Sequence, residues 1–309
     1  MRIAFLGTPE FAVPSFRMLI AQGHTLCAFT QPDKPQGRHA ALTPSPVKRL
    51  ALQYGIPVFQ PARIKSGEGL NMLRGFQPEL MVTAAFGQIL GAEDLAVPKF
   101  GCINVHGSLL PKYRGAAPIQ WAVINGETMT GVTTMFTELG LDTGDILLSK
   151  EIGIGPDETA GELYDRMAEL GAEVLQDTLA RLTAGTLTRV PQDEAAATKC
   201  RMLKKEDGRL DFTRPAAEVH SRVRGVNPWP GAYAFLLGAA EPLKLWRTRV
   251  ASEPAFGGPG TCAGDEKRGL FVACGEGAIE VLELQAPGGR RMDAKAYLRG
   301  KPLAGTVLA

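Results

Sequence analysis

Short apolar runs alternate with segments of helical spacing along the first half of the chain. The apolar runs occupy residues 2–7, 25–30, 57–59, 79–86 and 101–106, and helical spacing occurs at 11–21 and 47–54. Near-continuous apolar runs of this length are typical of strands that are buried on both faces by helices. The pattern therefore predicts an α/β fold with a doubly wound, mostly parallel sheet (Rossmann-like).

The pattern changes after the fifth run. Residues 130–139 alternate between apolar and polar positions, and 146–154 can pair with them. A long helix is expected from Glu158 to Ala184, capped by Asp157 or Thr159. These elements complete a first domain at residues 1–187.

Polar, poorly periodic residues at 188–206 are interpreted as a linker. The domain that follows, 207–309, has a different pattern of predicted elements. It begins with a predicted helix at 216–225 and continues with short candidate strands at 232–237, 243–250, 269–275 and 278–285. Short strands at regular spacing indicate a small barrel or sandwich.

Composition narrows the class of protein. The 309 residues are 45% hydrophobic and 21% charged, as in ordinary globular proteins. The five cysteines are scattered and the histidines number four, so neither a disulfide framework nor a metal site is expected, and the cytoplasm is the predicted location. No apolar run is long enough to span a bilayer, and the segment after Met1 does not read as a secretory signal.

Charge is unevenly distributed between the two parts. Residues 1–198 hold 16 Lys and Arg against 20 Asp and Glu, a net charge of −4, and residues 199–309 hold 18 against 12, a net charge of +6. A basic second part suggests a polyanionic partner. A solvated surface that happens to be basic explains the same numbers.

Asn104 and His106 stand out at the end of the apolar run 101–106. Residues two apart on a strand share a face, and ligands of an open parallel sheet bind beyond the carboxyl ends of its strands. The alternative is that both are satisfied polar residues at a strand end. An Asp142 that folds back toward His106, from the turn at 140–145, would orient the imidazole and stabilise its cation.

Other segments nearby suggest ligands. The turn at 108–111 could face a planar molecule, and Lys112 and Arg114 could meet an anionic tail, although both are also explained as surface charge. The basic loop 30–48 is long for a connection in an α/β domain. It either covers a phosphate-rich ligand or is a solvated loop.

The candidate cluster favours direct acyl transfer between two bound substrates. No GxSxG motif is present, and Gly7-Thr8-Pro9 after the first strand is not the GxGxxG of dinucleotide binding. An amide N–H and a protonated imidazole can stabilise the oxyanion of such a transfer. Asp142 and His106 would handle the proton that leaves the attacking amine.

The motifs resemble those of a known family. INVHGSLLPKYRGAAPI at 103–119, followed by GLDTGD at 140–145, is similar to the formyltetrahydrofolate-dependent formyltransferases, and the resemblance runs from Arg2 to about Gly289. PSPVK at 44–48 and NPWPGAY at 227–233 resemble the tRNA-acting branch. The resemblance implies 10-formyltetrahydrofolate as co-substrate, initiator methionyl-tRNA as acceptor and an OB-like C-terminal barrel that binds the tRNA. The residues themselves predict no metal and no membrane, and nothing in the sequence demands more than a monomer.

The resemblance also implies roles for individual residues. The catalytic trio would be Asn104, His106 and Asp142. The residues lining the folate site would be Ser108, Leu109, Leu110 and Pro111. Contacts to tRNA would come from Arg38, Lys48, Lys204 and Lys205.

The chain departs from the family pattern at two places. His39-Ala40-Ala41 stands where lysines are common, which weakens the expected phosphate contacts of that loop, and Phe86 replaces a frequent Tyr near the folate site. Three alternatives stay open. They are a formyltransferase acting on glycinamide ribonucleotide or an amino-sugar nucleotide, an RNA-binding protein that has lost catalysis, and a nicotinamide oxidoreductase.

Overall fold

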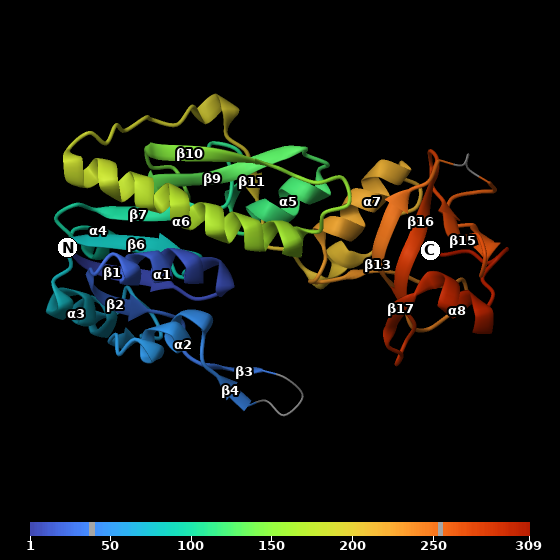
Figure 1. The fold of residues 1–309 in the computed structure, drawn as a ribbon, viewed down its shortest axis with the longest axis horizontal. Coiled ribbons are helices and arrows are strands. Elements are labelled where there is room, and N and C mark those ends of the chain that lie inside the picture. The colour runs from blue at the N-terminus through green and yellow to red at the C-terminus, as the bar shows by residue number, and fades with distance from the viewer. Residues whose placement is uncertain (37–40, 253–255) are drawn as a thin grey trace. The chain divides into compact units, whose positions relative to one another are not determined.

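The chain passes repeatedly between two units in the computed structural model, which describes residues 1–36, 41–252 and 256–309 (Figure 1). Unit 1 contains residues 1–115, 131–152 and 164–199, and unit 2 contains 116–130, 153–163 and 200–309. The predicted domain boundaries after residues 187 and 206 stay predictions. Residues 188–199 group with unit 1, where Val190 forms backbone hydrogen bonds with Ile146. The segments 116–130 and 153–163 group with unit 2.

A seven-stranded sheet forms the centre of unit 1, in the order β10-β9-β7-β6-β1-β2-β5. Its strands are β1 (Arg2–Gly7), β2 (Thr25–Phe29), β5 (Val58–Phe59), β6 (Leu80–Ala84), β7 (Cys102–His106), β9 (Met129–Phe136) and β10 (Ile146–Gly153). Five neighbouring strands run parallel to one another, namely β5, β2, β1, β6 and β7, and β9 runs antiparallel to β7. The predicted mostly parallel α/β sheet is confirmed.

Helices cover both faces of this sheet because successive side chains of its strands point to opposite faces. Phe5 stacks on Phe16 of α1 with ring centroids 4.7 Å apart, while Leu6 joins Leu73 of α3 in the buried cluster on the other face. The helices and 3-10 turns along this part of the chain are η1 (Glu10–Ala12), α1 (Val13–Ala21), α2 (Pro46–Gln53), α3 (Gly67–Phe76), α4 (Ala92–Leu95), α6 (Ala160–Ala184) and η2 (Glu194–Ala196). Two short strand pairs accompany them, β3 (Lys34–Gln36) with β4 (Ala41–Thr43) and β8 (Arg114–Gly115) with β11 (Lys199–Cys200).

The long helix α6 begins and ends with recognisable signals. Thr159, rather than Asp157, caps it: the Glu162 N–H donates to Thr159 Oγ1 at 3.3 Å, and the Thr159 N–H donates to Glu162 Oε2 at 2.9 Å. Gly185 follows its last residue in the left-handed conformation, at φ +70°.

An antiparallel β-sheet forms the larger part of unit 2. Its order is β12-β13-β16-β15-β14, and β17 also pairs with β16. The strands are β12 (Ala232–Ala234), β13 (Leu243–Val250), β14 (Cys262–Asp265), β15 (Gly269–Ala273), β16 (Ala278–Gln285) and β17 (Arg291–Asp293). The accompanying helices and 3-10 turn are α5 (Pro118–Ile124), η3 (Lys205–Gly208), α7 (Ala216–Gly225) and α8 (Ala294–Gly300).

The segment 306–309 joins the two ends of this sheet. The Phe235 N–H, just after β12, donates to the Ala309 carbonyl at 2.8 Å, and the Cys262 N–H at the start of β14 donates to the Thr306 carbonyl at 2.8 Å. The sheet is thus closed into a small barrel around buried side chains that include Val219 of α7. The predicted C-terminal antiparallel β domain is confirmed.

Two properties of the described residues bear on membranes and metal ions. None of the helices that they form is both long and apolar enough to cross a membrane. The same residues contain no group of three or more His, Cys, Asp or Glu side chains that could hold a metal ion.

Candidate active site

The carboxyl end of β7 carries Asn104 and His106 on one face of the sheet, as the sequence predicts. Asn104 lies opposite Thr83 of the neighbouring strand β6. The buried Thr83 hydroxyl donates to Asn104 Oδ1 at 2.8 Å. Because the carbonyl oxygen of the amide accepts this bond, the Asn104 NH₂ group remains as a donor on the other side of the amide. Thr83 therefore sets the direction in which Asn104 donates.

The His106 imidazole is 6% exposed and has a defined tautomer. Its Nε2 lies 3.0 Å from the Tyr113 backbone carbonyl oxygen. A carbonyl can only accept a hydrogen bond, so Nε2 carries a hydrogen. The other ring nitrogen, Nδ1, lies 3.8 Å from Asp142 Oδ2. Nδ1 is consequently the ring nitrogen that faces the carboxylate.

Asp142 reaches this position from the turn between β9 and β10. Its side chain is 15% exposed, and Oδ2 accepts a hydrogen bond from the Gly115 N–H at 2.8 Å. Its backbone is in the left-handed region, at φ +53°, where a residue other than glycine is held only at a cost. The structure thus brings together the three predicted catalytic residues.

The predicted folate-lining turn, Ser108 to Pro111, is held from inside by Thr133 of β9. The Thr133 hydroxyl donates to the Ser108 carbonyl at 2.7 Å, and the Leu110 N–H donates to the same hydroxyl oxygen at 3.2 Å. Ser108 is fully buried, and its own hydroxyl donates to the Lys112 carbonyl at 2.6 Å. Its polar groups therefore maintain the shape of the turn.

Leu109 and Gly131 explain how the turn packs on the sheet. Leu109 is partly exposed, Leu110 is 7% exposed and Pro111 is partly exposed. A Cβ at Gly131 would overlap the Leu109 side chain and the Lys150 carbonyl oxygen. Glycine at this point of β9 lets the turn lie close against the strand.

Arg114 is not a surface cation. It is 2% exposed, and its guanidinium donates to both carboxylate oxygens of Glu194 at 2.7 and 2.9 Å and to Gln192 Oε1 at 2.8 and 3.0 Å. The guanidinium is thereby committed to residues of its own chain. Lys112, in contrast, is exposed.

The predicted tRNA contacts differ in their surroundings. Arg38 lies outside the described residues. The Lys48 ammonium donates to Asp33 Oδ2 at 2.6 Å and to Gln60 Oε1 at 2.7 Å, and the first of these bonds is the main cause that lowers the pKa of Asp33. Lys204 and Lys205 are exposed in unit 2. Their roles at tRNA stay predictions.

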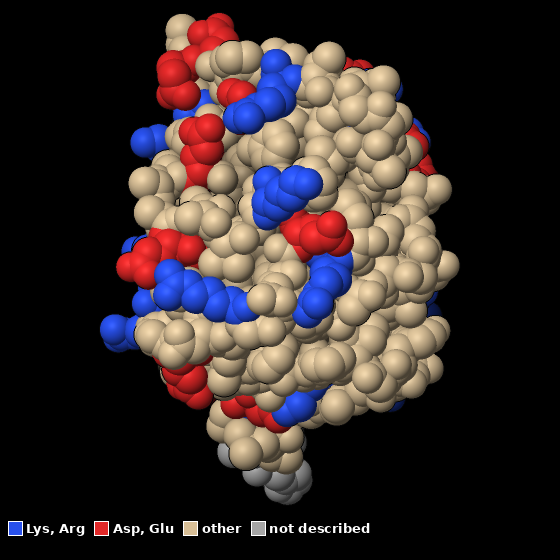
Figure 2. Space-filling view, turned by 90° about the vertical axis from the view of Figure 1, so that its left-hand side faces the viewer, with Lys and Arg blue, Asp and Glu red and all other residues tan. Residues whose placement is uncertain are grey.

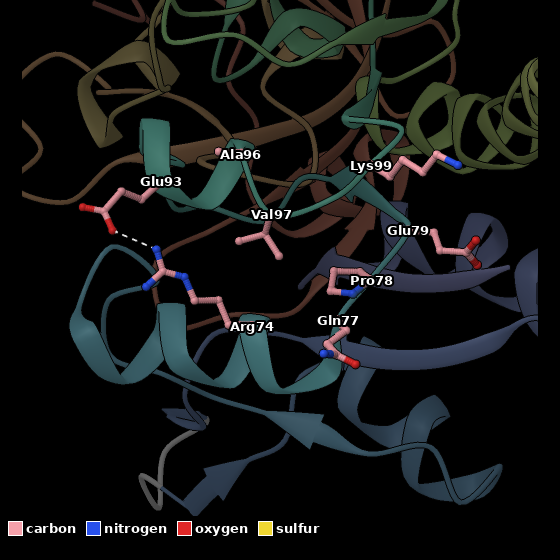
Figure 3. Close-up of a pocket in the computed structure, with 8 residues that line it drawn as sticks. All are labelled: Arg74, Gln77, Pro78, Glu79, Glu93, Ala96, Val97 and Lys99. Atoms are coloured by element: carbon pink, nitrogen blue, oxygen red, sulfur yellow. Dashed lines mark hydrogen bonds and ion pairs between the residues drawn. The ribbon is translucent and has the colours of Figure 1, made fainter.

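A hollow of unit 1 lies at the other edge of the sheet. It has a volume of about 430 Å³ and is lined by residues that include Arg74, Glu79, Glu93, Val97 and Lys99 (Figure 3). Glu79 precedes β6 and Lys99 precedes β7, so this is the amino-terminal edge. The face shown in Figure 2 carries acidic and basic side chains side by side, with no gathering of one sign. None of the predicted site residues that the structure describes lines this hollow.

Comparison with known proteins decides the family. Residues 1–179 match the family described as formyl transferase, and residues 202–302 match the formyl transferase C-terminal domain. A methionyl-tRNA formyltransferase of Ruminiclostridium cellulolyticum is 50% identical, over 98% of this chain and 97% of its own. The chain belongs to the methionyl-tRNA formyltransferase family. A second member, from Geobacter sulfurreducens, is also 50% identical, over 97% of this chain and 94% of its own.

A solved structure shows the same fold at low identity. WlaRD, a sugar 3N-formyl transferase crystallised in the presence of dTDP and 5-N-formyl-THF, has a TM-score of 0.69 at 17% identity, over 91% of this chain and 97% of its own. Family membership makes the chain an enzyme that transfers a formyl group. It removes the nicotinamide oxidoreductase from the alternatives.

Proposed function

We propose that the chain transfers the formyl group of 10-formyltetrahydrofolate to the α-amino group of methionyl-initiator tRNA. The observation that carries this proposal is the 50% identity, over nearly the whole length, to proteins named for formylating methionyl-tRNA. The motifs at 103–119 and 140–145 are the ones through which the sequence itself resembles formyltetrahydrofolate-dependent enzymes.

In the proposed reaction the amine nitrogen bonds to the formyl carbon, and the bond from that carbon to N10 of the folate breaks. Asn104 would donate from its NH₂ group to the oxyanion that develops, and the cationic His106 would stabilise it by charge. The proton lost by the amine would pass to the Asp142 carboxylate, beside His106 Nδ1, before N10 receives it. The direction imposed on the amide by Thr83 and the tautomer imposed by Tyr113 support these roles.

The two substrates require different surfaces. Ser108, Leu109, Leu110 and Pro111 would hold the folate ring, and the turn they form is already fixed by Thr133. Arg38, Lys48, Lys204 and Lys205 would meet tRNA phosphates, and the net charge of +6 on residues 199–309 supports a polyanionic partner.

We also propose that the enzyme works as a monomer in the cytoplasm. A single chain supplies all three catalytic residues of the proposed site. The five cysteines are free and buried, which suits a reducing compartment.

Another small acceptor, such as an amino-sugar nucleotide, is the competing proposal. WlaRD shares the fold but only 17% of its residues, whereas the methionyl-tRNA formyltransferases share half. The acceptor is therefore better inferred from the latter.

The decisive assay uses labelled 10-formyltetrahydrofolate and three acceptors, namely methionyl-initiator tRNA, methionyl-elongator tRNA and free methionine. The proposal predicts rapid labelling of the initiator tRNA and much slower labelling of the other two. Equal labelling of free methionine and of charged initiator tRNA would refute a role for tRNA recognition. Transfer only to an amino-sugar nucleotide would refute the acceptor.

A further inference from the structure

The segment Arg189–Thr198 runs beside the candidate site as a strap. At its first end Val190 pairs with Ile146 through backbone bonds of 2.8 and 2.9 Å, and Arg189 Nε donates to Asp145 Oδ2 at 2.9 Å. Asp145 is the last residue of the turn that carries Asp142, and Ile146 directly follows it. The strap is thus fixed to the downstream side of this turn.

The other end of the strap holds the segment that contacts His106. The Tyr113 N–H donates to Thr198 Oγ1 at 2.8 Å, and the Arg114 N–H donates to the Thr198 carbonyl at 2.8 Å. The carbonyl of the same Tyr113 accepts from His106 Nε2. One strap therefore bonds to the backbone on both sides of the His106–Asp142 pair.

Gln192, in the middle of the strap, bonds to the Asp142 turn itself. Its Nε2 donates to the Asp142 carbonyl at 2.9 Å and to the Gly144 carbonyl at 2.7 Å. Its Oε1 accepts from Arg114, whose guanidinium is held by Glu194 of the same strap. With both amide atoms engaged, the side chain has one orientation.

These bonds explain how the Asp142 backbone is kept at φ +53°. A left-handed residue other than glycine persists where its surroundings fix it. Gln192 ties together the carbonyls of Asp142 and Gly144, and the Gly115 N–H fixes the Asp142 carboxylate. Loss of the Gln192 amide would release these two backbone carbonyls, so the turn would no longer hold the carboxylate at its present distance from His106.

We propose that Gln192 is a positioning residue for formyl transfer, which acts by holding the Asp142 carboxylate 3.8 Å from His106 Nδ1. The inference rests on the proposed function and on the role of Asp142 in it. It assigns a task in catalysis to a residue of the predicted linker 188–206.

A double-mutant cycle tests this proposal. Gln192→Ala is compared with wild type, with Asp142→Ala and with the double variant, in single-turnover formyl transfer to methionyl-initiator tRNA. Gln192→Ala should lower the rate at saturation about 10-fold and leave KM for both substrates within about 2-fold, because a displaced catalytic group costs rate rather than binding. In the Asp142→Ala background the same change should alter the rate by less than about 2-fold. A loss of equal size in both backgrounds, or no loss in wild type, would overturn the proposal.

Two further variants separate positioning from folding. Gln192→Glu keeps an acceptor for Arg114 but removes the two N–H donors, so it should lose as much rate as Gln192→Ala; full activity would overturn the proposal. Ala196→Ser lies on the exposed part of the same strap and should behave as wild type. Thermal unfolding checks that each variant is folded.

Failure of the proposed function would be recognised separately. In that case wild type itself would not formylate charged initiator tRNA. Hydrogen exchange of the backbone amides at 140–146 then still tests whether Gln192 holds the turn that carries Asp142. It should be faster in Gln192→Ala than in wild type, and identical exchange would overturn the proposal.

Discussion

The two edges of the unit 1 sheet hold charged and polar side chains in contrasting ways. At the carboxyl edge, His106 is 6% exposed and Asp142 is 15% exposed, and each is bonded to a backbone group of residues 113–115. At the amino edge, Arg74 and Glu93 form an ion pair at 3.1 Å with side chains 55% and 74% exposed. The amino edge has the hollow shown in Figure 3, and the carboxyl edge has the fixed polar groups.

The contrast shows which property marks a reactive site. Exposed ion pairs add little free energy and leave both side chains free to move. Buried polar groups whose partners fix their donors and acceptors are organised before the substrate arrives, which is what catalysis requires. A hollow alone does not provide this, and the position of the carboxyl edge agrees with where ligands bind to open parallel sheets.

The largest effect is expected from Asn104→Asp. The change replaces an N–H donor with a negative charge facing the developing oxyanion, while the Thr83 hydroxyl keeps its acceptor. We expect kcat for formyl transfer to fall about 1,000-fold or more. Steady-state kinetics measures it, and near-normal turnover would contradict the assignment of Asn104.

Asp142→Asn should have the next largest effect. The amide oxygen can still accept from the Gly115 N–H, but the negative charge beside His106 Nδ1 is gone. A loss of about 100-fold in kcat is expected, since a proton-handling group contributes on this scale. If kcat stayed within about 3-fold of wild type, Asp142 would not support the imidazole.

Thr83→Val sharpens the comparison because it removes the bond that orients Asn104 and leaves the Asn104 side chain itself in place. The variant keeps the shape of the buried side chain and removes the hydroxyl that directs Asn104. We expect kcat to fall about 10-fold. The matched control is Thr134→Val, which breaks a buried 2.7 Å bond to Thr178 in the same unit away from the site. The control should retain kcat, and equal losses in both variants would indicate a general effect on the sheet.

Glu93→Gln at the amino edge should have the smallest effect. It breaks the exposed ion pair with Arg74 and touches none of the proposed machinery. The free energy of unfolding should change by no more than about 0.5 kcal/mol, and kcat should be unchanged. Denaturant titration and the same kinetic assay give both values. A large fall in kcat would contradict the proposal that catalytic groups lie at the carboxyl edge and not at the amino edge.

Much of the fold was predictable because its elements carry local signals. The apolar runs predicted the strands around β7, and the helical pattern at 216–225 predicted α7. The regular spacing of short strands suggested a barrel or sandwich, and the segment 306–309 closes the barrel in the structure. Asn104 and His106 were recognisable as two polar residues at the end of an apolar strand. Thr83 is recognisable in the sequence as the one hydroxyl side chain within the apolar strand β6. Its partner Asn104 on β7 follows from the register between the two strands, which the sequence does not reveal.

The remaining features depend on contacts between distant parts of the chain. Gln192 lies 50 residues from Asp142 in the sequence. The segment 188–206 around it is polar and has the sequence pattern of a linker, so the sequence does not single Gln192 out. Arg114 has the appearance of a surface cation in sequence, and only the structure pairs it with Glu194.

The most direct test of the account asks at which edge a formyl-folate binds. Four histidines give four imidazole signals in NMR, and two report on the opposite edges: His106 at the end of β7, and His24 just before β2. Burial and the N-terminal ammonium hold the pKa of His24 below its ordinary value of 6.5, and His24→Gln and His106→Gln variants assign the signals. Titration with 5-formyltetrahydrofolate should shift the His106 signal in a saturable way and leave His24 unchanged. A saturable shift of His24 with a stationary His106 would contradict the account.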